Sequence, residues 1–366
     1  MGKVTRGYVY RIRPNTSQKI LINKTFGCNR LMWNELLNDI KNKAYRTPKE
    51  IKTQYDFMYE CDSQSFTTTW KHLNQAIKHK KNKTHQFPKF KSKHDHIQSY
   101  TTHVVNNNIR LEGKYIRLPK LGKMRLVQHR ELPSESTIKA VTIKRDAGHY
   151  YVILRIVYEQ TKEKASDVRQ VIGLDYSLSH LYVDHNGNNP NYPKYYHKMM
   201  DHLAKAQRIL SKKVKGSNHY QKQKQKVQKI HKKISNQRKD FLHKVSRELV
   251  NKYDLICIED LDLKEMTKTK HFSKSIFDTS YHMFTLFLDY KTKDEGKSLI
   301  KINRYYPSTK TCSKCGNIQD IPLSQRTYIC DCGHKMDRDQ NAAINIATRG
   351  LISNLQTEYG TDSIAW

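Results

Sequence analysis

The 366-residue sequence lacks any run of about 20 apolar residues, the length that a membrane-spanning helix needs. Its first residues also lack the apolar core of a secretory signal. Both absences argue against a membrane protein or a secreted protein. We therefore expect a cytoplasmic protein with no membrane partner.

Acidic residues are scarce, because 34 Asp and Glu stand against 67 Lys and Arg and leave a net charge of +33 at pH 7. Roughly 2–8 net charges keep a small domain soluble, so solubility alone does not account for this excess. A polyanion accounts for it, and nucleic acid fits better than a membrane surface. The basic residues are dense over 202–249, which we interpret as a nucleic-acid-facing helical hairpin broken near 216–218.

The first part of the chain predicts a small β-barrel interrupted by helices. A strand over 4–13 is followed by helical spacing over about 17–43 and 48–80. From about 98 the pattern changes to short alternating runs typical of antiparallel strands. These runs cover residues 109–111, 115–118, 124–127, 138–144 and 150–158. We predict a barrel made of 1–16 and 96–160, with 17–95 as a helical insertion.

Polar residues 160–169 then predict a linker to an α/β domain, so that the whole chain is a multidomain α+β protein. Buried strands are predicted at 170–175 and 253–258 and a further strand at 298–302, and 181–184 should form a hairpin with the first of them. Helices are predicted at about 279–294 and 339–348. The polar residues from about 351 onward predict a poorly ordered tail.

Three acids stand at the ends of predicted elements: Asp175 and Glu259 after buried strands, and Asp339 at a helix start. Converging carboxylates can hold two Mg²⁺ ions for phosphodiester cleavage, which would make these acids both catalytic and metal-binding. Each could instead be an ordinary strand-end or helix-capping residue. Spacing alone does not decide this, because the acids are far apart in sequence.

Cys312, Cys315, Cys330 and Cys332 have zinc-ribbon spacing and predict a structural Zn²⁺ site, because four protein ligands leave no open position for water. The second pair is Cys-x-Cys, tighter than usual, so His334 is an alternative ligand. The other three cysteines, Cys28, Cys61 and Cys257, are most simply buried small hydrophobes.

With their flanking residues, these acids and cysteines resemble the TnpB family of transposon-encoded RNA-guided nucleases, which is related to type V CRISPR effectors. The strongest similarity lies in residues 172–175, 258–261, 308–316, 332–333 and 337–345. Weaker similarity lies in residues 8–14, 25–30 and 87–93.

The resemblance implies a RuvC-like nuclease with an RNase H fold split in sequence, built from 170–306 and 335–350, with a zinc-binding insertion at 307–334 and a tail at 351–366. It makes Asp175, Glu259 and Asp339 the motif acids, with Asp337 as a neighbour or substitute for Asp339. The barrel would be the wedge domain and the helical insertion the recognition domain.

The same resemblance implies that the protein binds a guide RNA, the omega RNA, and cuts both strands of target DNA beside a short motif. It also implies a prokaryotic, nucleoid-associated protein. Three alternatives stay open: a nuclease-inactive RNA-guided repressor, a compact type V CRISPR effector and a DNA-strand transferase. Cleavage of bound target DNA would separate the first from a nuclease.

Overall fold

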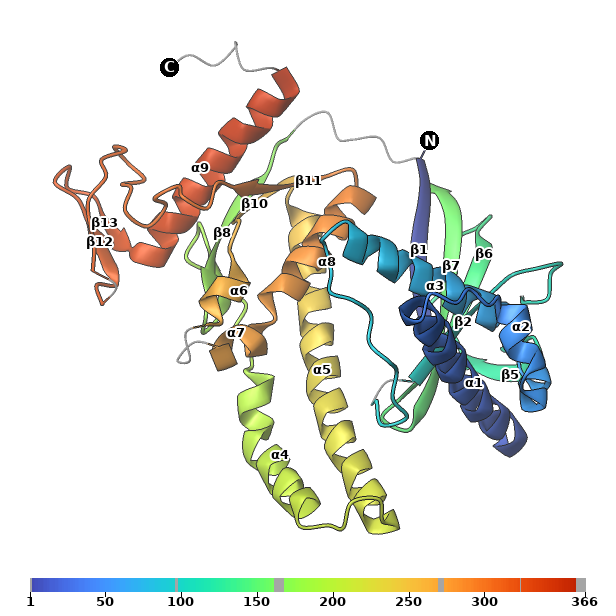
Figure 1. Ribbon diagram of the computed structural model, residues 1–366. Coiled ribbons are helices and arrows are strands. Elements are labelled where there is room, and N and C mark those ends of the chain that lie inside the picture. Colours follow the sequence, from blue (N-terminus) through green and yellow to red (C-terminus); the bar gives the residue numbers. More distant parts are fainter. Residues whose placement is uncertain (1, 96–97, 161–167, 269–272, 323, 360–366) are drawn as a thin grey trace. The chain divides into compact units, whose positions relative to one another are not determined.

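The computed structural model describes residues 2–95, 98–160, 168–268, 273–322 and 324–359 (Figure 1). The chain forms two compact units, residues 1–161 and 162–366. Across the described ranges, no helix is both long enough and apolar enough to cross a membrane. Of the predicted linker at 160–169, residues 161–167 lie outside the described residues.

The first unit is built on a seven-stranded antiparallel sheet with the order β2-β6-β7-β1-β5-β4-β3. Its strands are β1 Gly2–Arg13, β2 Gln98–His103, β3 Arg110–Glu112, β4 Tyr115–Leu118, β5 Gly122–Val127, β6 Thr137–Asp146 and β7 His149–Gln160. The first strand pairs with β7 on one side and with β5 on the other, so the predicted recruitment of the N-terminal strand is confirmed. The sheet is a curled half-barrel, not a closed barrel, because β2 and β3 are unpaired with each other in the described residues.

The core of this unit follows from alternation along the strands. In β1, Tyr8, Tyr10 and Ile12 are buried and the residues between them are exposed or half-buried. The helix that follows β1 adds Ile22 and Phe26 to the same apolar cluster. One face of the sheet therefore packs on the helical segment.

The helices of the first unit are α1 Thr16–Lys41, α2 Pro48–Thr53, the 3-10 helix η1 Asp56–Glu60 and α3 Ser63–Lys81. Asn15 caps α1 by accepting a hydrogen bond from the Gln18 backbone nitrogen. The helical stretch predicted over 48–80 is divided into the last three of these helices. The first of the three ends at Thr53, and Asp62 caps the last by accepting a hydrogen bond from the Gln64 backbone nitrogen at 3.1 Å.

The second unit has a four-stranded sheet with the order β11-β10-β8-β9. Its strands are β8 Val171–Ser177, β9 Leu181–Asp184, β10 Leu255–Glu259 and β11 Ser298–Ile302. The strands β8, β10 and β11 are parallel, and β9 forms the predicted antiparallel hairpin with β8. All four predicted strands are therefore present.

Helices cover both faces of this sheet. Ile172, Leu174, Ile256 and Ile258 face the cluster formed with α5 Asn218–Lys252 and α8 Tyr281–Asp294. The alternate residues of β10, Leu255 and Cys257, pack with Ile346 of α9 Arg338–Tyr359 on the other face. Which residue faces which helix is thus set by the two-residue period of the strands.

The remaining helices of the second unit are α4 Tyr195–Ser211, α6 Leu263–Met266 and α7 Ser273–Thr279. In Figure 1, α4 and α5 form the predicted long helical hairpin. The break between them contains Gly216 with a φ of +90°, and Ser217 caps α5 by accepting from the Tyr220 backbone nitrogen. The hairpin is confirmed.

The last helix is longer than predicted. It was expected to end near residue 348 and to give way to a poorly ordered tail, but α9 continues to Tyr359. Its extension is held because Leu351 packs in the cluster with Cys257 and because Asn354 is buried.

Gly173 lies where α9 crosses β8. A Cβ atom at this position would come within 2.0 Å of the Ala343 carbonyl oxygen and 2.6 Å of the Ala347 backbone nitrogen. A helix can approach a strand this closely only where the strand residue has no side chain. The glycine therefore fixes the position of α9 on the sheet.

We expect Gly173→Ala to lower the free energy of unfolding by about 2–4 kcal/mol, because the added methyl group must push α9 off the sheet. Urea unfolding measures the change. Gly27→Ala in α1 is the control, because the nearest atom to its Cβ is Arg30 Nη2 at 3.8 Å. That variant should be about 0.5–1 kcal/mol more stable than the wild type. Equal unfolding midpoints for Gly173→Ala and the wild type would contradict the close packing.

Candidate functional site

Two of the predicted acids lie side by side on neighbouring strands. The parallel strands β8 and β10 pair Leu174 with Ile258, so the next residues are Asp175 and Glu259. Neighbouring strands are about 4.8 Å apart, and residues in register point to the same face. This face is the one covered by α9, because Gly173 and Cys257, two residues earlier on the two strands, both contact that helix.

The third acid reaches the same face through α9. Ala343 packs on Gly173, and one helical turn before Ala343 stands Asp339. Two residues after Gly173 along the strand stands Asp175. Four residues of helix and two residues of strand each span about 6 Å, so the first turn of α9 brings Asp339 toward Asp175.

The charges of these acids act on one another. Burial raises the pKa of Asp175 well above its ordinary value, and the charges of Glu259 and Asp339 raise it further. Burial also raises the pKa of Glu259, against a hydrogen bond of 2.5 Å that Ser308 Oγ donates to its Oε1. Like charges are therefore gathered in a site of low solvent exposure, an arrangement that a cation would stabilise.

Asp337 and Asp339 have different positions at the start of α9. Asp337 is exposed and accepts hydrogen bonds from the backbone nitrogens of Asp339 and Gln340, at 2.9 and 3.0 Å, as an N-cap does. The Asp339 carboxylate lies 3.4 Å from Arg338 Nη2, whose positive charge lowers the pKa of Asp175. The charge of Asp339 is among the largest influences that raise the pKa of Asp175.

The donor set suits Mg²⁺, which prefers hard oxygen ligands and retains several waters. The three carboxylates do not gather as tightly as the cysteines, since in the described ranges only the cysteine set has all its ligand atoms within 4.8 Å. Two ions about 4 Å apart would be held by carboxylates shared between two ligand shells, which need not meet at one point. The buried hydroxyl of Tyr281, which the charges of Glu259 and Asp175 also reach, has no hydrogen-bond partner in the described structure.

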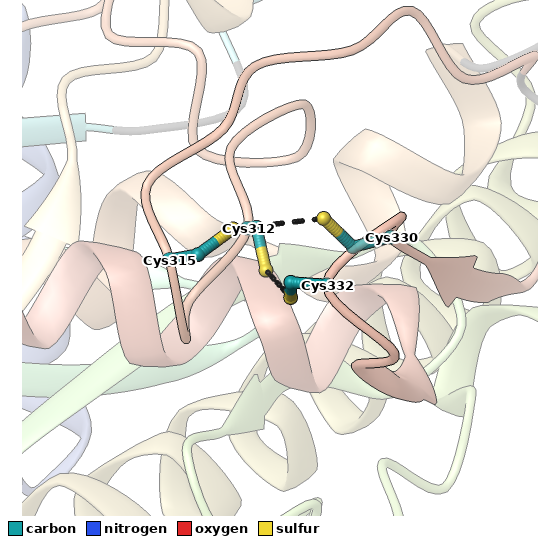
Figure 2. A group of neighbouring side chains, drawn as sticks. All are labelled: Cys312, Cys315, Cys330 and Cys332. Atoms are coloured by element: carbon teal, nitrogen blue, oxygen red, sulfur yellow. Dashed lines mark hydrogen bonds between the residues drawn. The ribbon is translucent and has the colours of Figure 1, made fainter.

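The four predicted cysteines converge. Figure 2 shows their side chains turned toward one another from two loops. Sγ of Cys312 lies 3.8 Å from Sγ of Cys332, and Sγ of Cys315 lies 3.6 Å from Sγ of Cys330. Tetrahedral coordination with zinc–sulfur bonds of about 2.3 Å places sulfur atoms about 3.8 Å apart. The sulfur spacing therefore fits a tetrahedral thiolate site.

The alternative ligand, His334, is outside this group. Its Nε2 lies 3.2 Å from Ser313 Oγ, and the four sulfur atoms form the cluster without it. The turn after each cysteine pair contains a glycine with positive φ, +78° at Gly316 and +82° at Gly333. Four cysteines, not three cysteines and a histidine, are the set that the structure brings together.

Buried side chains join the cysteine cluster to α9 and to Glu259. The amide of Asn341 donates to the Thr311 carbonyl oxygen at 2.7 Å and accepts from the Ser313 backbone nitrogen at 3.0 Å. Asn345 donates to the carbonyl oxygens of Ser308 and Thr311. The cluster therefore fixes both the helix that carries Asp339 and the serine that contacts Glu259.

Sequence reasoning gave no role to Ser308, Asn341 or Asn345, although all three lie in the segments of strongest similarity. Asn341 is fully buried and Asn345 nearly so. Two asparagines four residues apart on an apolar helix face could have indicated a role for Asn341 and Asn345, because buried amides need hydrogen-bond partners.

The tip of the α4–α5 hairpin is basic. Lys212, Lys213 and Lys215 are exposed at the turn, and the basic residues continue along α5. A solvated cationic hairpin can contact phosphate groups.

Family models match three parts of the chain. One described as "Probable transposase" matches residues 155–270 and therefore includes Asp175 and Glu259. A second, "Cas12f1-like, TNB domain", matches 281–346 and includes the four cysteines and Asp339. A third, "Helix-turn-helix domain", matches 1–49, where the structure has strand β1 followed by α1.

Individual relatives match over more of the chain. A mimivirus protein described as "TnpB-like protein L79" is 31% identical over 230 residues, 58% of this chain and 44% of the relative. A Streptomyces pristinaespiralis protein described as "Putative RNA-guided DNA endonuclease" is 30% identical over 371 residues, 97% of this chain and 91% of the relative. The chain belongs to the TnpB family.

The TnpB assignment agrees with further matches. An Escherichia coli K12 protein described as "Putative RNA-guided DNA endonuclease InsQ" is 27% identical, over 95% of this chain and 93% of the relative. A solved Cas12f1–sgRNA–target DNA complex contains a chain with the same fold, at a TM-score of 0.58 and 12% identity, covering 94% of this TnpB chain and 99% of that chain. This TnpB protein thus has a mixed α+β multidomain fold that resembles Cas12f.

Proposed function

We propose that this TnpB protein is an RNA-guided endonuclease that cuts double-stranded DNA beside a short target-adjacent motif, by Mg²⁺-dependent phosphodiester hydrolysis at one RuvC-like site. The observation that carries the proposal is the convergence of Asp175, Glu259 and Asp339 on the α9 face of the second sheet, where their charges act on one another. The Streptomyces and E. coli relatives are named for the same activity.

In this proposal the three carboxylates are the catalytic and metal-binding groups. Bound Mg²⁺ would supply Lewis-acid stabilisation of the phosphate and a water of lowered pKa. Asp175 and Glu259 would hold the metal from the rigid sheet, and Asp339 from the first turn of α9. Ser308 holds the Glu259 carboxylate in place through its short hydrogen bond.

The domain roles are part of the proposal. Residues 170–306 and 335–350 would form the RuvC-like domain with an RNase H fold, which the β8–β9 hairpin and the parallel strands β10 and β11 support. Residues 307–334 would be a structural zinc insertion that positions Asp339. The half-barrel of 1–16 and 96–160 would be the wedge domain, and 17–95 the recognition domain.

Charge supports a guide RNA and a DNA target as the partners. A net charge of +33 suits a long RNA together with a heteroduplex, because base pairing can supply sequence specificity while the protein holds the backbone. Because this proposal has one acid site for both DNA strands, each strand must reach the site as a single strand and be cut in turn.

Reconstitution tests the proposal. The protein is purified from a host that expresses its native locus, the co-purified RNA is sequenced, and the guide segment is reprogrammed to a plasmid target. We expect Mg²⁺-dependent cleavage of both strands of the matched plasmid, with a mismatched guide as the control. A complex that binds matched DNA and leaves both strands whole in Mg²⁺ is a repressor, and it would refute the nuclease.

A further inference from the structure

Two cysteines in the helical part of the first unit, remote in sequence from the zinc-type cluster, form a pair. Cys28 lies in α1, and Cys61 lies in the short turn between η1 and α3. Their Sγ atoms are 3.5 Å apart, and the residues are 4% and 1% exposed. Burial as small hydrophobes explains each cysteine alone, but it does not require that the two sulfur atoms meet.

We propose that Cys28 and Cys61 are a redox-active pair, which a hydroperoxide oxidises to a reversible disulfide that locks α1 to the segment leading into α3.

The surroundings shift the pKa values of the two thiols in opposite directions. The sulfur–sulfur hydrogen bond with Cys28 lowers the pKa of Cys61 to about 7; the Thr25 hydroxyl and the Lys24 charge also lower it, and burial and the Glu60 charge oppose them. The same hydrogen bond, with burial, raises the pKa of Cys28. One partner is therefore a thiolate near neutral pH and the other a thiol, as in reactive cysteine pairs.

The backbone allows the bond to form. A disulfide needs the sulfur atoms to close from 3.5 Å to about 2.05 Å. Cys28 is held within a long helix, but Cys61 has extended backbone angles, φ −92° and ψ 163°, in a turn that belongs to neither helix. A small movement of that turn brings the sulfur atoms together without unwinding α1.

The chemistry balances with a hydroperoxide as the two-electron oxidant. With hydrogen peroxide, the Cys61 thiolate attacks one peroxide oxygen, the O–O bond breaks and sulfenic acid forms, and the released hydroxide takes up a proton to become water. The Cys28 sulfur then attacks the Cys61 sulfur, forming the S–S bond, and the sulfenic oxygen leaves as a second water with the Cys28 proton. A thiol reductant reverses the reaction by exchange.

Local opening of η1 and α2 would admit the oxidant, because Cys28 and Cys61 share an apolar cluster with Ile51 of α2 and Met58 of η1. These elements have five and six residues, and short elements open locally more easily than long helices. The Lys24–Glu60 ion pair beside Cys61 is about half exposed, so it gives little resistance to opening.

The test is peptide mapping of the full-length protein after titration with hydrogen peroxide and alkylation of free thiols. We expect a Cys28–Cys61 disulfide peptide, lost on reduction, whose rate of formation rises as the pH passes about 7. Cys257 is the internal control, because burial raises its pKa to about 12 and it should be recovered as a free thiol. The oxidised protein should melt about 5–10 °C higher than the reduced protein.

Cys28→Ser is the matched variant and should abolish both the disulfide peptide and the peroxide-induced rise in melting temperature. Recovery of Cys28 and Cys61 as free thiols, under conditions that oxidise an exposed reference thiol, would overturn the proposal. So would over-oxidation of Cys61 with no crosslink. Neither result depends on nuclease activity.

Discussion

Asp175→Asn is expected to slow cleavage of both DNA strands by roughly a thousandfold or more, because under the proposed function it removes a metal-binding carboxylate and several kcal/mol of transition-state stabilisation. The substitution keeps the shape of the side chain, so binding of guide RNA and target DNA should remain. Single-turnover cleavage with a matched guide measures the rate, and a gel-shift assay measures the binding.

The same substitution should stabilise the protein in magnesium-free buffer at neutral pH. The folded-state pKa of Asp175 is raised, so the stability linked to this group is present at low pH and is lost as the pH rises through that pKa. Asparagine carries no charge, so the variant does not lose this stability as the pH rises. We therefore expect the variant to have a higher melting temperature than the wild type without Mg²⁺. The difference in melting temperature should decrease when Mg²⁺ stabilises the wild type.

Asp260→Asn is the matched control for Asp175→Asn. Asp260 follows Glu259, is 43% exposed and pairs with Arg304, outside the acid site. The Asp260→Asn variant should cut DNA at the wild-type rate and keep the wild-type dependence on Mg²⁺. An undiminished cleavage rate for Asp175→Asn would contradict the proposed catalytic role of Asp175.

Cys332→Ser is expected to lose the proposed structural zinc and, with it, the proposed cleavage activity. Structural zinc contributes about 10–16 kcal/mol of apparent binding energy, which is also folding energy. We expect about one zinc per wild-type chain and far less in the variant, by elemental analysis. The melting temperature should fall by about 10 °C or more, and cleavage should be lost, because Asn341 and Asn345 join the cysteine loop to the helix carrying Asp339.

His334→Ala separates the two possible ligand sets. His334 lies beside Ser313 and outside the sulfur cluster, so this variant should retain its zinc and its melting temperature. Zinc lost from His334→Ala and retained by Cys332→Ser would instead establish three cysteines and a histidine as the ligands.

The sequence predicted local features well because their signals lie within a few residues. The strand at β11 was predicted with its observed bounds, and the break between α4 and α5 followed from a Gly-Ser-Asn turn. Two helix bounds differ from the prediction. Asp62 caps a new helix within the helical stretch predicted over 48–80, and tertiary packing of Leu351 extends α9 through a polar stretch.

By itself, the sequence determined the excess of positive charge, the close spacing of the four cysteines, and the strand ends at which Asp175 and Glu259 stand. Those features depend on composition and short covalent spacing. Only the tertiary structure decided that Asp175 and Glu259 are in register, that Gly173 lets α9 bring Asp339 to them, and that Cys28 meets Cys61. These contacts join residues far apart in the chain, and only the packing of helices on sheets selects them.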